Sequence, residues 1–463
     1  MCHERIDIDR RVDGRAALWV LPILLSCAIG IAGAATVVPE DAAAFDLKEI
    51  STFDVPDAEK SSFLFGVLVA CETEPDAKAV RYPALQSDKP LYGSFHVGAS
   101  DMELDAGYHY RFAMDESAGA GRGYDRMYID MNCNGDLTDD GVCSPMKDVP
   151  AKALFEFGSD ATQVCFETIR LQIVPGEDPS QGLEVMPRLL VLGDRRYAVL
   201  TTMKARTGEI RIGENKFTAV LGHSGAIPGR FDHPETGLFL FAANGPSDRS
   251  LASWYGGDRL MAMHRAGDTY YRLAATPSGD KLFVWPCRGP FGTLELKAGQ
   301  RKVQNVSFSG TLGSKDMAIS LTDGLGGQDL PPSKSFRLPV GDYTPLLMSV
   351  SYDALSCLIL RNRHADGLVG GRARQGPAIY AVQIREDKPF VLDFSGQPQV
   401  VFASPARGHR VKPGSDLEVK AVLIDPSLDV MFRRIGRDDS FNPRVVIKRS
   451  NGEIVAEGVM PFG

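Results

Sequence analysis

The sequence carries no excess of positive charge. Its 463 residues include 51 lysines and arginines against 59 aspartates and glutamates, which gives a formal net charge of −8, and these residues are spread along the chain. Proteins that bind nucleic acids or anionic membrane surfaces do so through concentrated basic patches. We therefore expect no nucleic-acid partner.

The common zinc and nucleophile motifs are also missing. The eight histidines are scattered, without a His-x-x-x-His or His-Glu-x-x-His spacing, and no Cys-x-x-Cys occurs. The segment Gly222-His223-Ser224-Gly225 resembles part of a hydrolase nucleophile elbow, but Ala226 stands where the motif needs glycine. The following Ile227-Pro228-Gly229 prevents a helix from starting. Ser224 is therefore predicted to be a loop serine.

Carboxylate pairs offer a weak case for a glycosidase. Asp115-Glu116, Asp232 and Glu235 are candidates, because that chemistry requires two carboxyl groups at a fixed separation. Among 59 acidic residues such pairs arise by chance. The polar run Arg361–Gly367 follows an apolar strand at Leu358–Leu360, and we expect it to be a solvated turn.

After residue 35 no run of 18 uninterrupted apolar residues occurs, so no later transmembrane segment is expected. Near the N-terminus, three arginines precede an uncharged run over residues 16–39, which is typical of a secretory signal peptide. Ala32-Gly33-Ala34 suits cleavage after Ala34. An uncleaved membrane anchor, or a lipoprotein site at Leu24-Leu25-Ser26-Cys27, are the alternatives. The protein is predicted to be exported: periplasmic, cell-surface or secreted.

Cysteines are few. Removal of residues 1–34 leaves six, an even number that permits disulfides in an exported chain. We expect Cys133 to pair with Cys143, since the two bracket the acidic half of one loop, with Cys143–Cys165 or Cys71–Cys165 as alternatives. Cys287 and Cys357 suit buried thiols equally well.

Helical periodicity is nearly absent, whereas short apolar or alternating runs recur between turn residues. Two hairpins are predicted, one around Gly213-Glu214-Asn215 and one around Ser450-Asn451-Gly452. The fold class is therefore all-β, with several β-sandwich-like modules in tandem and an immunoglobulin-like C-terminal module.

The predicted organisation has six parts. A weak recurrence of Tyr110–Ala113 as Tyr271–Ala274 is compatible with a diverged repeat of the two central units, and equally with a chance match between strand-rich segments. The Gly- and Pro-rich segment 324–332 suits a linker. The parts are a signal peptide (1–34), a linker (35–57), a β unit (58–187), a second β unit (188–325), a β-sandwich segment (326–389) and an Ig-like β segment (390–463).

One motif is specific. After the predicted strand Met127–Ile129, oxygen-bearing side chains occupy loop positions 1, 3 and 5, and Gly135 occupies position 6, as in the first half of an EF-hand calcium loop. Calcium requires six to eight oxygen ligands, and glycine permits the sharp bend. Leu137 is expected to anchor the loop to the core. The predicted ligand residues are Asp130, Asn132, Asn134, Asp136 (through its backbone carbonyl), Asp139 and Asp140.

The second half departs from the EF-hand pattern. Position 12 is Gly141, which has no carboxylate, so Asp139 and Asp140 are expected to replace the usual glutamate. The alternative is an Asx-rich turn whose side chains cap only their own backbone. The loop, without flanking helices, resembles the Asp-rich loops of dockerins and of uncharacterised exported bacterial β-rich proteins. This resemblance implies structural calcium.

Together these features favour a non-catalytic, exported calcium-binding β protein. We expect it to serve as a structural or binding module of the cell envelope or exterior, with an unidentified protein or polysaccharide as its ligand. The rival hypothesis is an extracytoplasmic hydrolase, with glycans as a candidate substrate, that carries accessory β modules.

Overall fold

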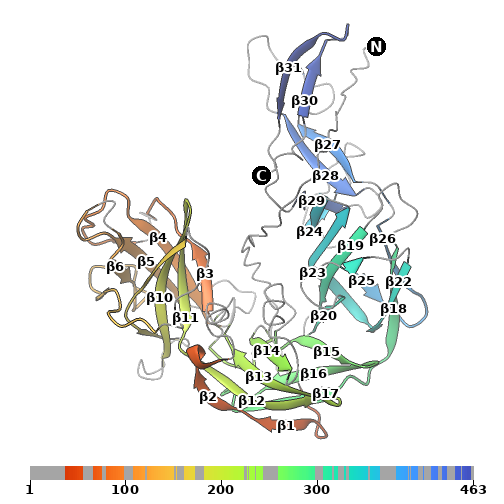
Figure 1. Ribbon diagram of the computed structural model, residues 1–463, viewed down its shortest axis with the longest axis horizontal. Helices are drawn as coiled ribbons and strands as arrows, with labels where there is room; N and C mark the ends of the chain where they lie inside the picture. Colours follow the sequence, from red (N-terminus) through yellow and green to blue (C-terminus); the bar gives the residue numbers. More distant parts are fainter. Residues whose placement is uncertain are drawn as a thin grey trace. The chain divides into compact units, whose positions relative to one another are not determined.

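The predicted all-β class is confirmed in the computed structural model of the chain (Figure 1). In the part of the chain that the structure describes, strands β1 to β31 are accompanied by a single short 3₁₀ helix, η1 (Thr52–Asp54). The described residues are 37–55, 66–75, 80–98, 108–119, 123–150, 153, 161–172, 182–223, 227, 229–234, 236–242, 259–297, 306–314, 317–321, 328–329, 333–352, 355–364, 382–394, 396, 398–404, 410, 419–425, 430–434, 444–449 and 451–459.

The chain divides into two compact units. The first unit holds the described residues of 24–289 and 311–320, and the second holds those of 290–310 and 321–463. The predicted boundary between 187 and 188 falls inside strand β10 (Leu183–Leu192). The predicted boundary between 325 and 326 and the predicted signal peptide lie outside the described residues.

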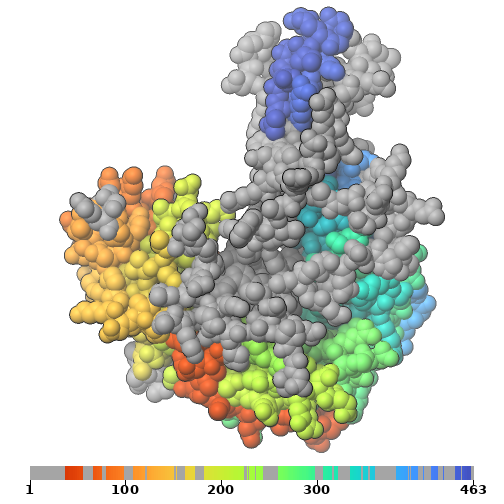
Figure 2. Space-filling model, viewed as in Figure 1, coloured from red at the N-terminus to blue at the C-terminus, as the bar shows by residue number. Residues whose placement is uncertain are grey.

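A four-stranded and a five-stranded sheet of the first unit share one core, here called the first sandwich. One sheet has the order β4-β5-β6-β7, and the other has the order β3-β11-β10-β8 with β9 also paired to β10. In the space-filling view its described residues run from orange to yellow-green (Figure 2). The strands are β3 (Gly66–Ala70), β4 (Leu91–Val97), β5 (Tyr108–Asp115), β6 (Arg126–Ile129), β7 (Val142–Cys143), β8 (Ala161–Cys165), β9 (Ile169–Leu171), β10 and β11 (Arg195–Thr202).

Alternation along β4 and β5 builds the core of the first sandwich. Phe95 and Phe112 are both fully buried, and their rings stack with centroids 4.9 Å apart. Gly93 makes room for this arrangement, because a Cβ there would lie 2.5 Å from Cζ of Phe112. Side chains in a strand alternate between faces, so the residues between these positions lie on the opposite face of the sheet.

A second pair of sheets in the first unit encloses another apolar cluster. The order β14-β13-β12-β2 forms one sheet, and β1-β17-β16-β15 forms part of the other, with β20 (Ala318–Ser320) parallel to β15. Their core includes Ile210, Leu221, Leu238 and Leu273. The strands are β1 (Ala43–Asp46), β2 (Lys48–Ser51), β12 (Lys204–Ile212), β13 (Asn215–Gly222), β14 (Gly237–Ala242), β15 (Ala262–Ala266), β16 (Thr269–Ala275) and β17 (Lys281–Pro286).

The second unit is also built of strands. The order β22-β18-β26 forms a small sheet, and a larger one includes β23-β24-β29-β28-β27 with β25 paired to β23. The strands are β18 (Phe291–Lys297), residues 306–310 of β19 (Val306–Gly313), β21 (Gln328–Asp329), β22 (Ser333–Pro339), β23 (Gly341–Tyr352), β24 (Leu355–His364), β25 (Val382–Ile384), β26 (Phe390–Asp393), β27 (Gln399–Ser404), β28 (Lys420–Asp425), β29 (Val430–Arg434), β30 (Arg444–Lys448) and β31 (Ile454–Val459).

Residues 390–463 share sheets with the segments before them. β26 pairs in parallel with β18, and β29 pairs with β24. The predicted hairpins are both present, as β12–β13 and as β30–β31. The predicted turn at Arg361–His364 is wrong, because these residues continue strand β24, while 365–367 lie outside the described residues. No helix within the described ranges is long and apolar enough to cross a membrane.

Candidate metal centre

The Asp-rich loop connects two antiparallel strands of the first sandwich. Strand β6 ends at Ile129, and β7 begins at Val142. Tyr128 pairs with Val142, so the sheet itself draws the two ends of the loop together. No helix flanks the loop on either side, as the sequence predicts.

Asp130 is the fixed point of the loop. Its side chain is buried, Oδ1 accepts a hydrogen bond from the backbone N–H of Asn134 at 3.0 Å, and Oδ2 accepts one from Gly135 at 2.9 Å. Its own N–H donates to the carbonyl of Arg111 on β5 at 2.9 Å. Gly135 has a φ of +81°, a conformation that a residue without a Cβ adopts at little cost. The first carboxylate is therefore held against the turn that glycine makes possible.

Alternate side chains then fold back over the loop. Oδ1 of Asn132 accepts from the N–H of Asn134 at 3.0 Å, Oδ1 of Asn134 from Asp136 at 2.7 Å, and Oδ1 of Asp136 from Thr138 at 2.9 Å. These are successive Asx turns. They bond the side-chain oxygens at positions 3, 5 and 7 to the backbone of the loop, and both the calcium loop and the self-capped turn predict hydrogen bonds of this kind.

The far end of the loop returns to the beginning. Asn134 donates from Nδ2 to Oδ2 of Asp139 at 2.9 Å. Asp140 accepts a backbone hydrogen bond from Met131, yet its Oδ2 is buried and has no hydrogen-bond partner among the described residues. Burial raises the pKa of the Asp140 carboxyl, and the charges of Asp139, Asp130 and Asp136 raise it further. An Asx-rich turn that caps only its own backbone does not explain why Oδ2 of Asp140 is buried without a hydrogen-bond donor among the described residues.

The rear of the loop is attached to an earlier segment. Leu137 is fully buried in a cluster with Tyr92 and Ala113, so its predicted anchoring role is confirmed. Arg81 donates its N–H to the carbonyl of Gly135 at 2.7 Å, and its guanidinium lies 3.0 Å from Oδ2 of Asp136. The hydroxyl of Thr138 lowers the pKa of Asp136, as does Arg81. The carboxylate of Asp136 is therefore held by Arg81 and Thr138.

The candidate metal ligands of the loop are all oxygen atoms. Within the described ranges, no three His, Cys, Asp or Glu side chains form a group suited to a metal ion. The loop would use two asparagine amides and a backbone carbonyl beside its carboxylates, which are hard ligands of the type that calcium takes.

The carboxylates considered for glycosidase chemistry have other partners. Asp115 is fully buried and accepts hydrogen bonds from the N–H groups of Gln86 and Ser87 at 2.8–3.1 Å. Glu116 accepts from the Ser87 hydroxyl and from the Gly123 N–H, each at 2.8 Å. Both residues therefore hold neighbouring loops in place.

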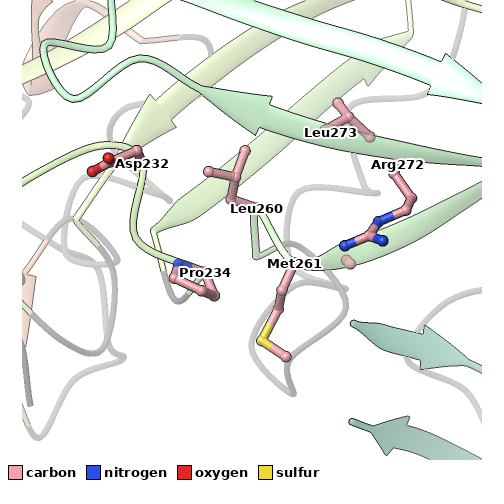
Figure 3. A pocket seen from close by; sticks show the side chains of 7 residues that line it. Asp232, Pro234, Leu260, Met261, Arg272 and Leu273 are labelled. Carbon is pink, nitrogen blue, oxygen red and sulfur yellow. The ribbon is translucent and has the colours of Figure 1, made fainter. Parts of the chain in front are cut away.

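Asp232 lines a small pocket at the second pair of sheets (Figure 3). Its carboxylate is bound by Arg230, with Nε 3.0 Å from Oδ1 and Nη2 2.5 Å from Oδ2. Glu235 lies outside the described residues. Asp232 is the one acidic residue among those described at the pocket, whose lining is Asp232, Pro234, Leu260, Met261, Ala262, Arg272 and Leu273.

The contacts of His223 indicate a structural role. Ser224 lies outside the described residues. The His223 side chain is 1% exposed and stacks on Phe231 with centroids 4.9 Å apart. Burial, and then the nearby His233, lower the pKa of His223 to about 4, so the imidazole is neutral at pH 7.

The predicted Cys133–Cys143 disulfide is wrong, because both are free thiols, as are Cys71 and Cys165. Cys133 has a φ of +54°, and its Sγ lies 3.7 Å from the carbonyl of His109. Cys143 belongs to the core of the first sandwich, whereas Cys165 packs in a separate cluster with Phe53 and Met186. Cys71 and Cys133 pack against the same core as Cys143, so packing on a shared core does not by itself make a disulfide.

No protein-family model matches the chain, and neither the curated proteins nor the solved structures include a significant match.

Proposed function

We propose that this protein is an exported β protein in which residues 130–140 bind one structural calcium ion. Its sandwich modules would serve as structural or binding units at the cell envelope or exterior, with a protein or polysaccharide as ligand. The role is non-catalytic. The proposed calcium site is supported by the oxygen-rich loop between two strands of the first sandwich.

The buried oxygen of Asp140 carries the proposal. A buried polar atom without a hydrogen bond costs free energy, and a buried carboxylate near three others costs more. A divalent cation would supply the missing partner and reverse the repulsion with Asp139, Asp130 and Asp136. The same ion would accept the free lone pairs of the asparagine amides.

Chelation tests the proposal. We expect thermal melts of the wild-type protein to show a higher transition in calcium than in excess chelator. At free calcium about ten times the dissociation constant, the ion contributes about 1.4 kcal/mol. Asp130→Ala should abolish the difference. Asp268→Ala, which removes a 97% exposed carboxylate of the same unit, should retain it.

Identical wild-type melts in both conditions, together with no calorimetric calcium uptake up to about 10 mM, would leave the loop as an acidic turn. The hydrolase alternative gains no support from Asp115, Glu116 and Asp232, since all three bind protein donors.

A further inference from the structure

Two histidines face each other on the outer side of the first sandwich. His96 on β4 and His109 on β5 are register partners in the antiparallel ladder. Their neighbours Phe95 and Tyr110 point into the core, so the two imidazoles lie on the opposite face. His109 is exposed and His96 half-buried, so solvent reaches the pair at His109.

The separation of the two rings suits a shared metal ion. Their centroids are 4.7 Å apart, and their planes are inclined by 60°. Two imidazoles that bind one zinc ion at about 2.0–2.1 Å, with an N–Zn–N angle of about 90–110°, have centroids about 4.6–5.3 Å apart. The observed distance falls within this range without any change of backbone.

The nitrogens of His96 are available. Both Nδ1 and Nε2 are buried and have no hydrogen-bond partner among the described residues. Buried polar atoms in proteins are nearly always satisfied, so this ring has unused binding capacity. Burial, and then His109, lower the pKa of His96, which keeps the imidazole neutral with one lone pair free.

We propose that His96 and His109 bind one divalent transition-metal ion, with zinc as the probe. Each residue supplies one imidazole nitrogen, and water completes the coordination. Imidazole suits zinc, copper and nickel, whereas calcium takes oxygen ligands. The site is thus chemically distinct from the loop at residues 130–140 and does not depend on that loop binding calcium.

Zinc titration of the full chain in about 10 mM calcium, which saturates hard-oxygen sites, tests the proposal. His109→Phe keeps a cross-strand ring contact but removes the ligand nitrogen, and His109→Gln on the exposed strand position is a second variant. Ser94→Ala, on the same face of β4, is the matched control.

We expect calorimetry to show one more zinc ion per chain in the wild-type protein and in Ser94→Ala than in either His109 variant. Zinc should raise the melting temperature of the first two proteins only. If all four take up the same number of ions with the same melting shift, the two histidines are only a cross-strand aromatic pair.

Discussion

Asp140 holds one carboxylate oxygen away from solvent and from hydrogen-bond donors among the described residues. We expect Asp140→Asn to stabilise the protein in excess chelator, because the amide removes a charge that Asp139, Asp130 and Asp136 repel. In calcium the same change should destabilise the protein relative to wild type, because it removes an ionic ligand. Thermal melts of both proteins in both solutions measure this reversal of sign.

The pH dependence of stability in excess chelator provides the control. Burial raises the pKa of Asp140 above its ordinary value of 3.8, so the folded state holds this proton more tightly than the unfolded state does. Stability is then lost as the pH rises from 3.8 through the raised pKa, and Asp140→Asn should lack this loss. A destabilising effect of Asp140→Asn in both chelator and calcium would contradict the repulsion argument.

Residue-level prediction succeeds where the determinants are local. The spacing of Asp130, Asn132 and Asn134 predicts the alternate turns that the structure contains. The contact of Arg81 with Asp136 crosses 55 residues, and the register that brings His96 to His109 depends on how two strands pair. Neither arrangement has a signal in sequence order.

At the scale of elements, three hairpins share one kind of turn. Gly193, Gly213 and Gly267 are each the first residue of a two-residue connection, with φ of +58° or +59°, and an acidic residue follows each of them. Positive φ at the first turn residue alone is the type II′ pattern, which suits the twist of antiparallel strands. The sequence predicts a turn over Gly213-Glu214-Asn215, and in the structure Asn215 already belongs to strand β13.

We expect Gly193→Ala and Gly213→Ala each to lower the free energy of unfolding by about 1–3 kcal/mol, because an L-residue is strained at this φ. Gly213→Ala should cost more, since its Cβ would lie 3.1 Å from Cβ of Ala266, whereas a Cβ at Gly193 meets nothing within 4 Å. Urea denaturation measures both. Equal losses would show that the Ala266 contact relaxes freely.

Element boundaries follow from sequence less well than element type. Alternating apolar residues predict strands such as Lys281–Trp285, which is found in β17 (Lys281–Pro286). The polar residues Arg361–His364 read as a turn because they break that alternation, yet they extend β24. The predicted boundary at 187/188 lies inside β10 because that strand pairs on both sides with β8 and β11. Pairing partners, unlike apolar patterns, are not visible in the sequence.

At the scale of the whole molecule, two histidines make the first unit sensitive to acid, the buried His223 and the half-buried His264. Burial lowers the pKa of His223 and of His264 to about 4. The unfolded state therefore binds protons more readily, and stability present above pH 6.5 is lost as the pH falls toward 4. Each imidazole contributes up to about 3 kcal/mol to this loss. We expect calorimetric melts between pH 7 and pH 4 to show it.

His223→Phe tests the assignment, because phenylalanine keeps the stack on Phe231 and removes the titration. Its melting temperature should fall less between pH 7 and pH 4 than that of the wild type. Ser94→Ala, at an exposed position without a titratable group, should behave as the wild type does. An unchanged slope in His223→Phe would assign the acid sensitivity to other groups.

The attachment of Arg81 to the Asp-rich loop has a consequence for the order in which the chain folds. Arg81 and Asp136 are 55 residues apart, and β4, β5 and β6 lie between them. Closing so long a segment costs chain entropy before any contact compensates for it. The loop can therefore reach Arg81 only once these three strands have come together. An ion that rigidifies the loop would stabilise a contact that forms late in folding. Calcium should then slow unfolding more than it speeds folding.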